Sequence, residues 1–208
     1  MLITIHPDSP EPRKMEQVVA CLEKGGIVVY PTDTLYGIGC DITNAAAVQK
    51  ILKFKDVNLR KTNLTFICHD LSHAAQYVRP ISSRTFRLMK KNTPGPFTFI
   101  VEASSSVPKI FKSGKKTVGV RIPDSNIILE LVQRLGRPIL STSVKVAGEE
   151  TEDEYLTDPS LIQERLGHIA DIVIDGGIGS LDMSTVVDCT TDDWEIIRQG
   201  KAELDDAI

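Results

Sequence analysis

The stretch GGIVVYPTDTLYGIGCD (residues 25–41) joins a short apolar run to a long polar segment. Its run IVVY is β-branched and aromatic, which predicts a buried strand. The ten residues that follow, 31–40, include two threonines, a tyrosine and two glycines, whereas a plain turn needs only two to four residues. The segment therefore predicts one wall of a ligand pocket at the end of a strand. Gly37 and Gly39 are expected to let the backbone turn tightly towards the next helix.

Helical and strand patterns alternate along the rest of the chain, without internal repeats or a clear linker. Apolar residues at helical spacing predict helices over 15–24, 44–54, 72–78, 83–91 and 125–136. Runs rich in β-branched and aromatic residues predict strands over 27–30, 63–68, 97–103, 117–123, 138–142, 170–175, 184–189 and 194–198. We therefore expect one α/β domain over 1–208, with a twisted, mostly mixed β-sheet flanked by helices and no additional C-terminal domain.

The bulk composition is ordinary for a folded soluble protein, and the cysteine spacing leads us to expect reduced core thiols in a cytoplasmic protein. The chain has 208 residues and is 41% hydrophobic, enough for one good-sized core. No apolar run approaches the roughly 18 residues of a membrane helix, and the N-terminus lacks the pattern of a secretory signal. The four cysteines are widely spaced, which argues against a zinc site and against a disulfide framework.

The charges are segregated along the chain. The net charge of −4 alone disfavours a nucleic-acid partner. However, the windows 50–61, 84–91 and 109–121 hold 14 of the 24 lysines and arginines and only one acid, Asp56. Such segregation can create a local positive field on an acidic protein. The sequence leaves open whether the three windows converge or form separate solvated faces.

Several known site patterns fail here. A Walker A loop in KSGKKT (112–117) would need glycine at Lys109 and a hydroxyl residue at Lys116. The segment GGIGSLD (176–182) lacks the third glycine of a Rossmann loop and precedes a strand rather than a helix. No G-x-S-x-G accompanies the four histidines, and the acids do not form a metal-binding pattern.

Small hydroxyl residues recur at the ends of predicted strands. Arg121 lies within an apolar strand and Arg198 ends the last one; a buried arginine is costly unless it is paired or meets an anion. The hydroxyls could simply satisfy turns, but together with the two arginines they favour an anionic ligand. The hydroxyl residues are Thr32, Thr34, Thr117, Ser141, Ser143, Ser184 and Thr185.

Eight segments, in this order, make the chain resemble the YrdC family, most closely its YciO-like branch. The resemblance covers nearly the whole chain and implies a single α/β domain with a concave, positively charged face. The segments are GGIVVYPTDTLYGIGCD, the helix leading to KILKFK, NLTFICHDLS, FRLMKKNTPGPFTFIVEA, KTVGVRIPD, PILSTSVKVAGE, STVVDC and IIRQGK.

The resemblance also implies an activity. The best-known members are nucleotidyltransferases that make threonylcarbamoyl-AMP and pyrophosphate from threonine, bicarbonate and ATP, for the threonylcarbamoyladenosine modification of tRNA. ATP and Mg²⁺ are thus the implied cofactors, and threonine or a similar small acid and bicarbonate the implied partners. The alternative is a protein that binds tRNA or double-stranded RNA in the same basic cleft without this catalysis.

Motif by motif, the resemblance assigns Thr34, Arg121 and Ser184 to the amino-acid substrate. It assigns no nucleophile, because the reaction depends on positioning and charge neutralisation, and it leaves metal ligands open. Assigned to the nucleotide are Lys53, Lys55, Arg60, Lys61, Thr117, Ser141, Ser143, Lys145 and Arg198.

Two signatures depart from the active members. Their Lys-x-Arg reads Lys53-Phe54-Lys55 here, so an ammonium replaces a planar guanidinium. Their Ser-x-Asn reads Ser143-Val144-Lys145, so an amide that could both donate and accept is lost. Both departures are typical of the YciO-like branch and predict an altered activity or substrate.

Overall fold

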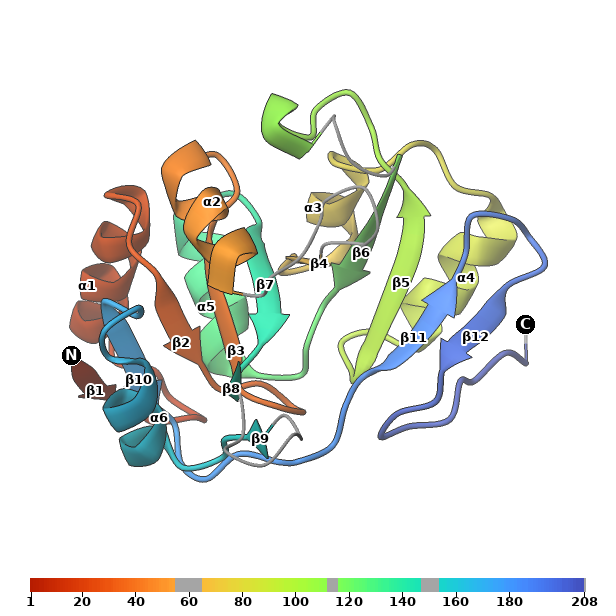
Figure 1. The fold of residues 1–208 in the computed structure, drawn as a ribbon. Coiled ribbons are helices and arrows are strands. Elements are labelled where there is room, and N and C mark those ends of the chain that lie inside the picture. Colours follow the sequence, from red (N-terminus) through yellow and green to blue (C-terminus); the bar gives the residue numbers. More distant parts are fainter. Residues whose placement is uncertain (55–64, 112–115, 147–153, 208) are drawn as a thin grey trace.

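The apolar run after Gly26 forms strand β2 (Val28–Tyr30), which belongs to a mixed sheet of ten strands (Figure 1). The computed structural model describes residues 1–54, 65–111, 116–146 and 154–207. In spatial order the strands are β1 (Leu2–Thr4), β10 (Ile172–Asp175), β2, β3 (Gly37–Asp41), β7 (Ile139–Ser143), β4 (Thr65–Ile67), β6 (Thr117–Arg121), β5 (Phe97–Glu102), β11 (Thr185–Asp188) and β12 (Glu195–Arg198). A separate hairpin pairs β8 (Lys145–Val146) with β9 (Glu154–Tyr155).

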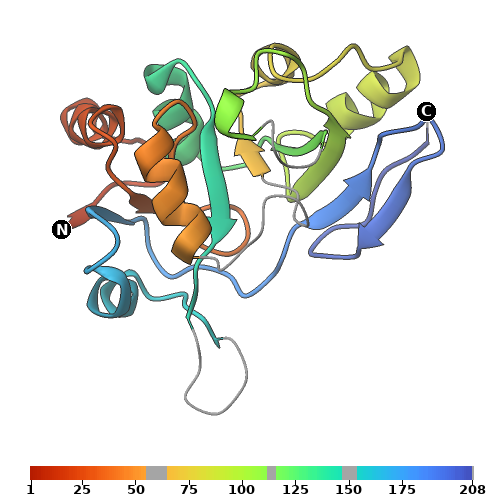
Figure 2. The ribbon, with the colours of Figure 1, turned by 45° about the horizontal axis from the view of Figure 1, so that its top comes forward.

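The strand directions confirm the expected mixed sheet. Neighbours are parallel in β1–β10, β10–β2, β4–β6 and β5–β11, and antiparallel in the other five pairs. Strands β1 and β10, with the N-terminus, lie at one end of the sheet. Strands β11 and β12, with the C-terminus, lie at the other end (Figures 1 and 2).

Helices pack on both faces of the sheet. One core cluster joins buried residues of α2, α3, α4 and α6 to alternate residues of the central strands, such as Phe99. A second cluster joins α1 and α5 to Val28, Tyr30 and Ile139. No helix of the described ranges is long and apolar enough to cross a membrane. The helices are α1 (Pro12–Glu23), α2 (Ala45–Phe54), α3 (Leu71–Ala75), α4 (Ser83–Lys91), α5 (Asn126–Leu135), α6 (Pro159–Leu166) and the 3₁₀ turn η1 (Lys109–Phe111).

The expected turn at Gly37 and Gly39 is wrong. Both glycines lie in β3, a fully buried strand, and neither is among the glycines with positive φ. They are needed for close packing instead. A Cβ on Gly37 would lie 2.6 Å from the Tyr30 ring, and one on Gly39 would lie 2.4 Å from the Leu140 carbonyl oxygen. The polar segment is therefore shorter than predicted and ends where β3 begins.

The basic window 84–91 does not face the same way as Arg121. It forms α4, whose buried Leu88 and Met89 belong to the cluster that contains Phe99. Because successive side chains of a strand point to opposite faces, Phe99 and its neighbour Thr98 lie on opposite faces of the sheet. Thr98 and Arg121 line one cavity, so the basic residues of α4 and Arg121 lie on opposite faces of the sheet.

A buried ion pair provides a test of the fold. The Asp41 carboxylate is 2% exposed. Its Oδ2 accepts from Arg137 Nε at 2.6 Å, and its Oδ1 accepts from the Thr43 backbone N–H and hydroxyl. We expect Arg137→Ala to lower the free energy of unfolding by about 2–3 kcal/mol, because it leaves part of a buried carboxylate unpaired. Urea denaturation measures this.

The matched control is Arg134→Ala. Arg134 makes a partly exposed i,i+4 pair with Glu130 on α5, and surface pairs of this kind contribute about 0.5 kcal/mol. Equal effects of the two substitutions would contradict the role given to Asp41.

His73 provides a second test. Burial lowers its pKa to about 4, with His69 stacked beside it at 4.4 Å between ring centroids. The unfolded chain, with an ordinary histidine pKa near 6.5, binds the proton more readily than the folded protein. Stability should therefore be full above about pH 6.5 and fall as the pH drops from there towards 4. Urea denaturation at pH 7 and pH 5 should show this loss reduced in His73→Leu; an identical loss would contradict it.

Candidate functional site

A cavity of about 190 Å³ lies on the face of the sheet that carries Arg121. Strands β3, β4, β5, β6, β7 and β11 contribute to its wall, so segments far apart in sequence meet there. Its polar lining is rich in hydroxyl groups and contains two guanidinium groups. These polar residues are Thr32, Thr65, Thr98, Arg121, Ser141, Thr142, Ser143, Ser184 and Arg198.

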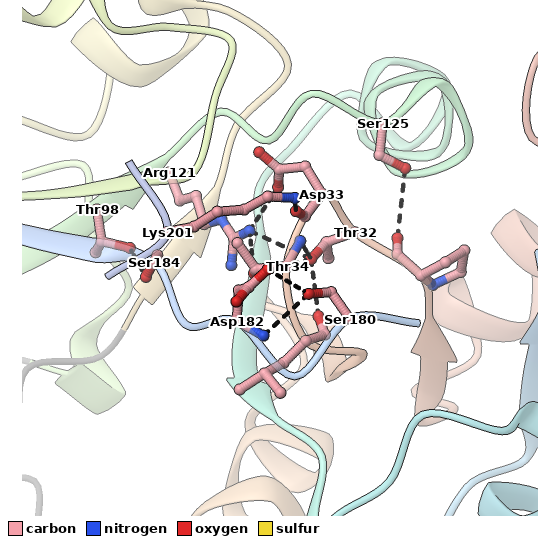
Figure 3. A network of polar contacts seen from close by, with 12 residues as sticks. Thr32, Asp33, Thr34, Thr98, Arg121, Ser125, Ser180, Asp182, Ser184 and Lys201 are labelled. Atoms are coloured by element: carbon pink, nitrogen blue, oxygen red, sulfur yellow. Dashed lines mark hydrogen bonds and ion pairs between the residues drawn. The ribbon is translucent and has the colours of Figure 1, made fainter. Parts of the chain in front are cut away.

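The segment between β2 and β3 is bound to the Arg121 side chain (Figure 3). Arg121 Nη2 donates to Thr34 Oγ1 at 2.6 Å, to Asp33 Oδ1 at 2.6 Å and to Thr32 Oγ1 at 3.2 Å. The Thr32 hydroxyl in turn donates to the Leu35 carbonyl oxygen and accepts from the Thr34 backbone N–H. This polar segment is thus a folded loop that encloses the end of the arginine.

Ser184 lies at the other side of the cavity, just before β11. Its hydroxyl is 3.0 Å from the Thr98 hydroxyl of β5, where either group can donate. Arg198 of β12 donates to the Ser184 carbonyl oxygen at 2.8 Å and to its hydroxyl at 3.2 Å. Arg198 therefore orients Ser184 as well as lining the cavity itself.

Tyr30 contacts two residues of the cavity wall, Gly37 and Ser141. It is fully buried, and burial raises its pKa, so its hydroxyl stays protonated. The hydroxyl donates to Ser141 Oγ at 2.5 Å. This bond leaves the Ser141 proton available to a ligand. Gly37, which lies over the Tyr30 ring, lines the same cavity.

The structure brings together only part of the set expected from the sequence. Of the expected substrate residues, Arg121 and Ser184 line the cavity, whereas Thr34 is 1% exposed and lies behind Arg121. Of the expected nucleotide residues, Ser141, Ser143 and Arg198 line it. Thr117, Lys53 and Lys145 do not line it. Lys55, Arg60 and Lys61 lie outside the described residues.

Several residues with a part in the site were not assigned to a ligand from the sequence. Thr65, Thr98 and Thr142 line the cavity, as does Thr32, which was noted only as a hydroxyl at a strand end, and Asp33 binds Arg121. Lys201 Nζ donates to the Asp33 carbonyl oxygen at 2.7 Å, although the two residues are 168 positions apart. The adjacency of Asp33 to Thr34 and the position of Lys201 three residues after Arg198 were the available signals.

The arrangement suits the binding of an anion better than nucleophilic catalysis. Hydroxyl and guanidinium donors converge on one cavity, whereas the described cysteines are thiols with a raised pKa, three of them near 12 because of burial. Within the described ranges no group of three or more His, Cys, Asp or Glu residues could hold a metal ion. The site can bind and orient an acid and neutralise charge.

Comparison with known proteins agrees with this geometry. The Sua5/YciO/YrdC family model, described as "Telomere recombination", matches residues 20–200. An uncharacterized Haemophilus influenzae protein is 40% identical over 197 residues, covering 94% of this chain and 93% of that protein. Escherichia coli YciO, also uncharacterized, is 37% identical over 201 residues, covering 96% and 95%. A Vibrio vulnificus threonylcarbamoyl-AMP synthase is 29% identical and covers 89% and 98%.

Solved structures give the same result. The crystal structure of E. coli YciO matches with a TM-score of 0.89, covering 100% of this chain and 99% of that one. P. abyssi Sua5 in complex with L-threonine matches with a TM-score of 0.84 at 26% identity, covering 96% of this chain but 57% of Sua5. By sequence and by fold, the protein belongs to the Sua5/YciO/YrdC family.

Proposed function

We propose that this protein is an ATP-dependent enzyme of the threonylcarbamoyl-AMP synthase type, acting on threonine or a similar small acid. The observation that carries the proposal is the Arg121 guanidinium, held by the Thr32–Thr34 loop at a hydroxyl-lined cavity. Such a donor set suits a carboxylate. The Sua5 structure with L-threonine and the V. vulnificus synthase support the choice of substrate and reaction.

The size of the cavity supports an amino acid as its occupant. Drug-sized ligands occupy pockets of about 300–1,000 Å³, and this cavity is about 190 Å³. ATP would therefore extend beyond it. Ser143, which is exposed at the end of β7, is a suitable residue at the rim for the nucleotide.

The proposed reaction needs few protein groups that react themselves. The threonine amine attacks the carbon of bicarbonate, an N–C bond forms and water leaves, which gives a carbamate. A carbamate oxygen then attacks the α-phosphorus of ATP. One oxygen–phosphorus bond forms, the bond to the β-phosphate breaks, and pyrophosphate leaves with the electron pair. Arg121 and Ser184 would hold the amino acid, while Arg198 would position Ser184 and add positive charge.

Mg²⁺ would enter with the nucleotide. Magnesium is commonly bound by substrate phosphates with only one or two carboxylates, so the described donor set, without a carboxylate cluster, fits it in this form. When bound, Mg²⁺ supplies charge neutralisation on the phosphates.

Substitution of Arg121 tests the proposal. With ATP, threonine, bicarbonate and Mg²⁺, the native protein should release pyrophosphate and form threonylcarbamoyl-AMP, detected by mass spectrometry. Arg121→Lys should lower this rate about 100-fold, because lysine keeps the charge but cannot hold the loop and the ligand with one planar group.

Arg134→Lys, on the surface of α5, is the control and should leave the rate unchanged. No product from the native protein, together with no thermal stabilisation by ATP or threonine, would refute the proposed function.

Lys145 departs from the family's Ser-x-Asn signature, so restoring asparagine at this position should raise the enzymatic rate. Lys145 is exposed in β8, at the position of the family's asparagine. Lys145→Asn restores an amide that both donates and accepts, and we expect it to raise the rate of threonylcarbamoyl-AMP formation several-fold. Combining it with Lys55→Arg should raise the rate further. A rate that stays the same or falls would show that these positions do not limit this reaction.

Binding of tRNA or double-stranded RNA remains a prediction from the sequence. No contact among the described residues favours it specifically, since the basic residues of α4 lie over the opposite face of the sheet from the cavity.

A further inference from the structure

The Arg121 guanidinium is engaged mainly through one of its nitrogens. All three of its hydrogen bonds leave from Nη2, to Thr32, Asp33 and Thr34. An –NH₂ group has two hydrogens, so three acceptors saturate it. Within the described part of the chain Nη1 makes no hydrogen bond, and Nε is buried without a hydrogen-bond partner. A ligand therefore meets Arg121 through Nη1, provided that the guanidinium keeps its present orientation.

Asp33 is the charged member of this group. Its side chain is 10% exposed, that of Arg121 is 11% exposed, and the two form an ion pair at 2.6 Å. The pair is monodentate, because Asp33 Oδ2 is buried and has no hydrogen-bond partner among the described residues. Arginine–carboxylate pairs are frequently bidentate, and a buried pair is favourable only when further hydrogen bonds satisfy its remaining polar atoms. Unsatisfied buried groups call for another explanation, such as a role in a site.

Lys201 fixes Asp33 from the opposite end of the chain. Its Nζ donates to the Asp33 carbonyl oxygen at 2.7 Å (Figure 3), and in the described ranges it has no carboxylate within the 4 Å of an ion pair. Its backbone N–H donates to the Met183 carbonyl oxygen at 2.8 Å. The same short segment that precedes Ser184 therefore holds Lys201, so both walls of the cavity are connected through this lysine.

We propose that Asp33 and Lys201 are positioning residues: Asp33 fixes the Arg121 guanidinium so that Nη1 faces the cavity, and Lys201 holds Asp33 in place. This inference rests on the proposed function in that the ligand of Nη1 is the carboxylate of the small acid. Asp33 also neutralises Arg121, so the arginine contributes directed hydrogen bonds more than net charge. Lys201 then places a positive charge next to the site, which among the described residues is not in an ion pair.

Two readouts test the proposal on the full-length protein. The first is the side-chain ¹⁵N–¹H spectrum of arginine, with the Arg121 signals assigned by their loss in Arg121→Lys. A pinned guanidinium rotates slowly and gives separate Nη1 and Nη2 signals. Asp33→Ala should merge or broaden them, whereas Asp33→Asn, which retains an acceptor, should keep them separate. The second is the dissociation constant of L-threonine by calorimetry.

The expected changes in affinity follow from the geometry. Asp33→Ala should raise the dissociation constant of L-threonine about tenfold, Asp33→Asn should restore most of the loss, and Lys201→Met should raise it about threefold. Asp206→Asn and Lys90→Met are matched controls, because both residues are exposed, neither lines a cavity that contains Asp33 or Lys201, and neither makes a hydrogen bond or ion pair in the described structure. Both controls should bind as the native protein does.

The outcomes separate the two proposals. If the native protein does not bind L-threonine, the proposed substrate is wrong, and the arginine spectrum still decides whether Asp33 orients Arg121. Unchanged Arg121 signals in Asp33→Ala would overturn the positioning role. Tighter binding of L-threonine by Asp33→Ala would also overturn it, because Asp33 would then be a competitor of the ligand for Arg121.

Discussion

The bond network around the Arg121 guanidinium is the constraint on which the rest of the site depends. A charge that is 11% exposed must be paired, and here the Thr32–Thr34 loop supplies all three acceptors. The same bonds fold the loop over the arginine and define one wall of the cavity. The hydrogen bonds that stabilise the loop are therefore the same ones that orient the arginine.

The sheet makes this network possible. Arg121 ends β6, the loop joins β2 to β3, and Ser184 precedes β11. Parallel and antiparallel pairings bring these segments to one face, while helices fill the two core clusters. Gly37 and Gly119, which have no Cβ, leave space there, and the Tyr30 ring packs against Gly37. A cavity for a small molecule thus arises from strand order rather than from one local motif.

Much of the fold could be predicted from local patterns. The helix expected at 83–91 is α4, and the mixed α/β sheet is confirmed. Strand β3 was missed because its sequence, GIGCD, reads as a turn; its glycines are explained only by Tyr30 and Leu140, which are distant contacts. Helix α6 and strand β1 were also missed. In α6 only Pro159, Ile162 and Leu166 are buried, and β1 has three residues with one buried side chain, so the apolar pattern of each is weak.

The site was predictable in its chemistry but less so in its membership. Hydroxyl residues at strand ends, with Arg121 and Arg198, indicated an anion site, and the cavity contains both arginines. Thr34 and Thr32 are two positions apart, and only the folded loop shows that Thr32 lines the cavity while Thr34 lies behind Arg121. Lys201 could not be assigned, because its contact with Asp33 spans 168 positions.

The most direct test of this account is a crystal structure of the protein soaked with L-threonine. The account predicts a threonine molecule in the cavity, with its carboxylate within hydrogen-bond distance of Arg121 Nη1 and the Thr32–Thr34 loop still bound to Nη2. A crystal soaked at a saturating concentration of L-threonine that shows no ligand in this cavity, or shows threonine bound elsewhere, would contradict the central claim.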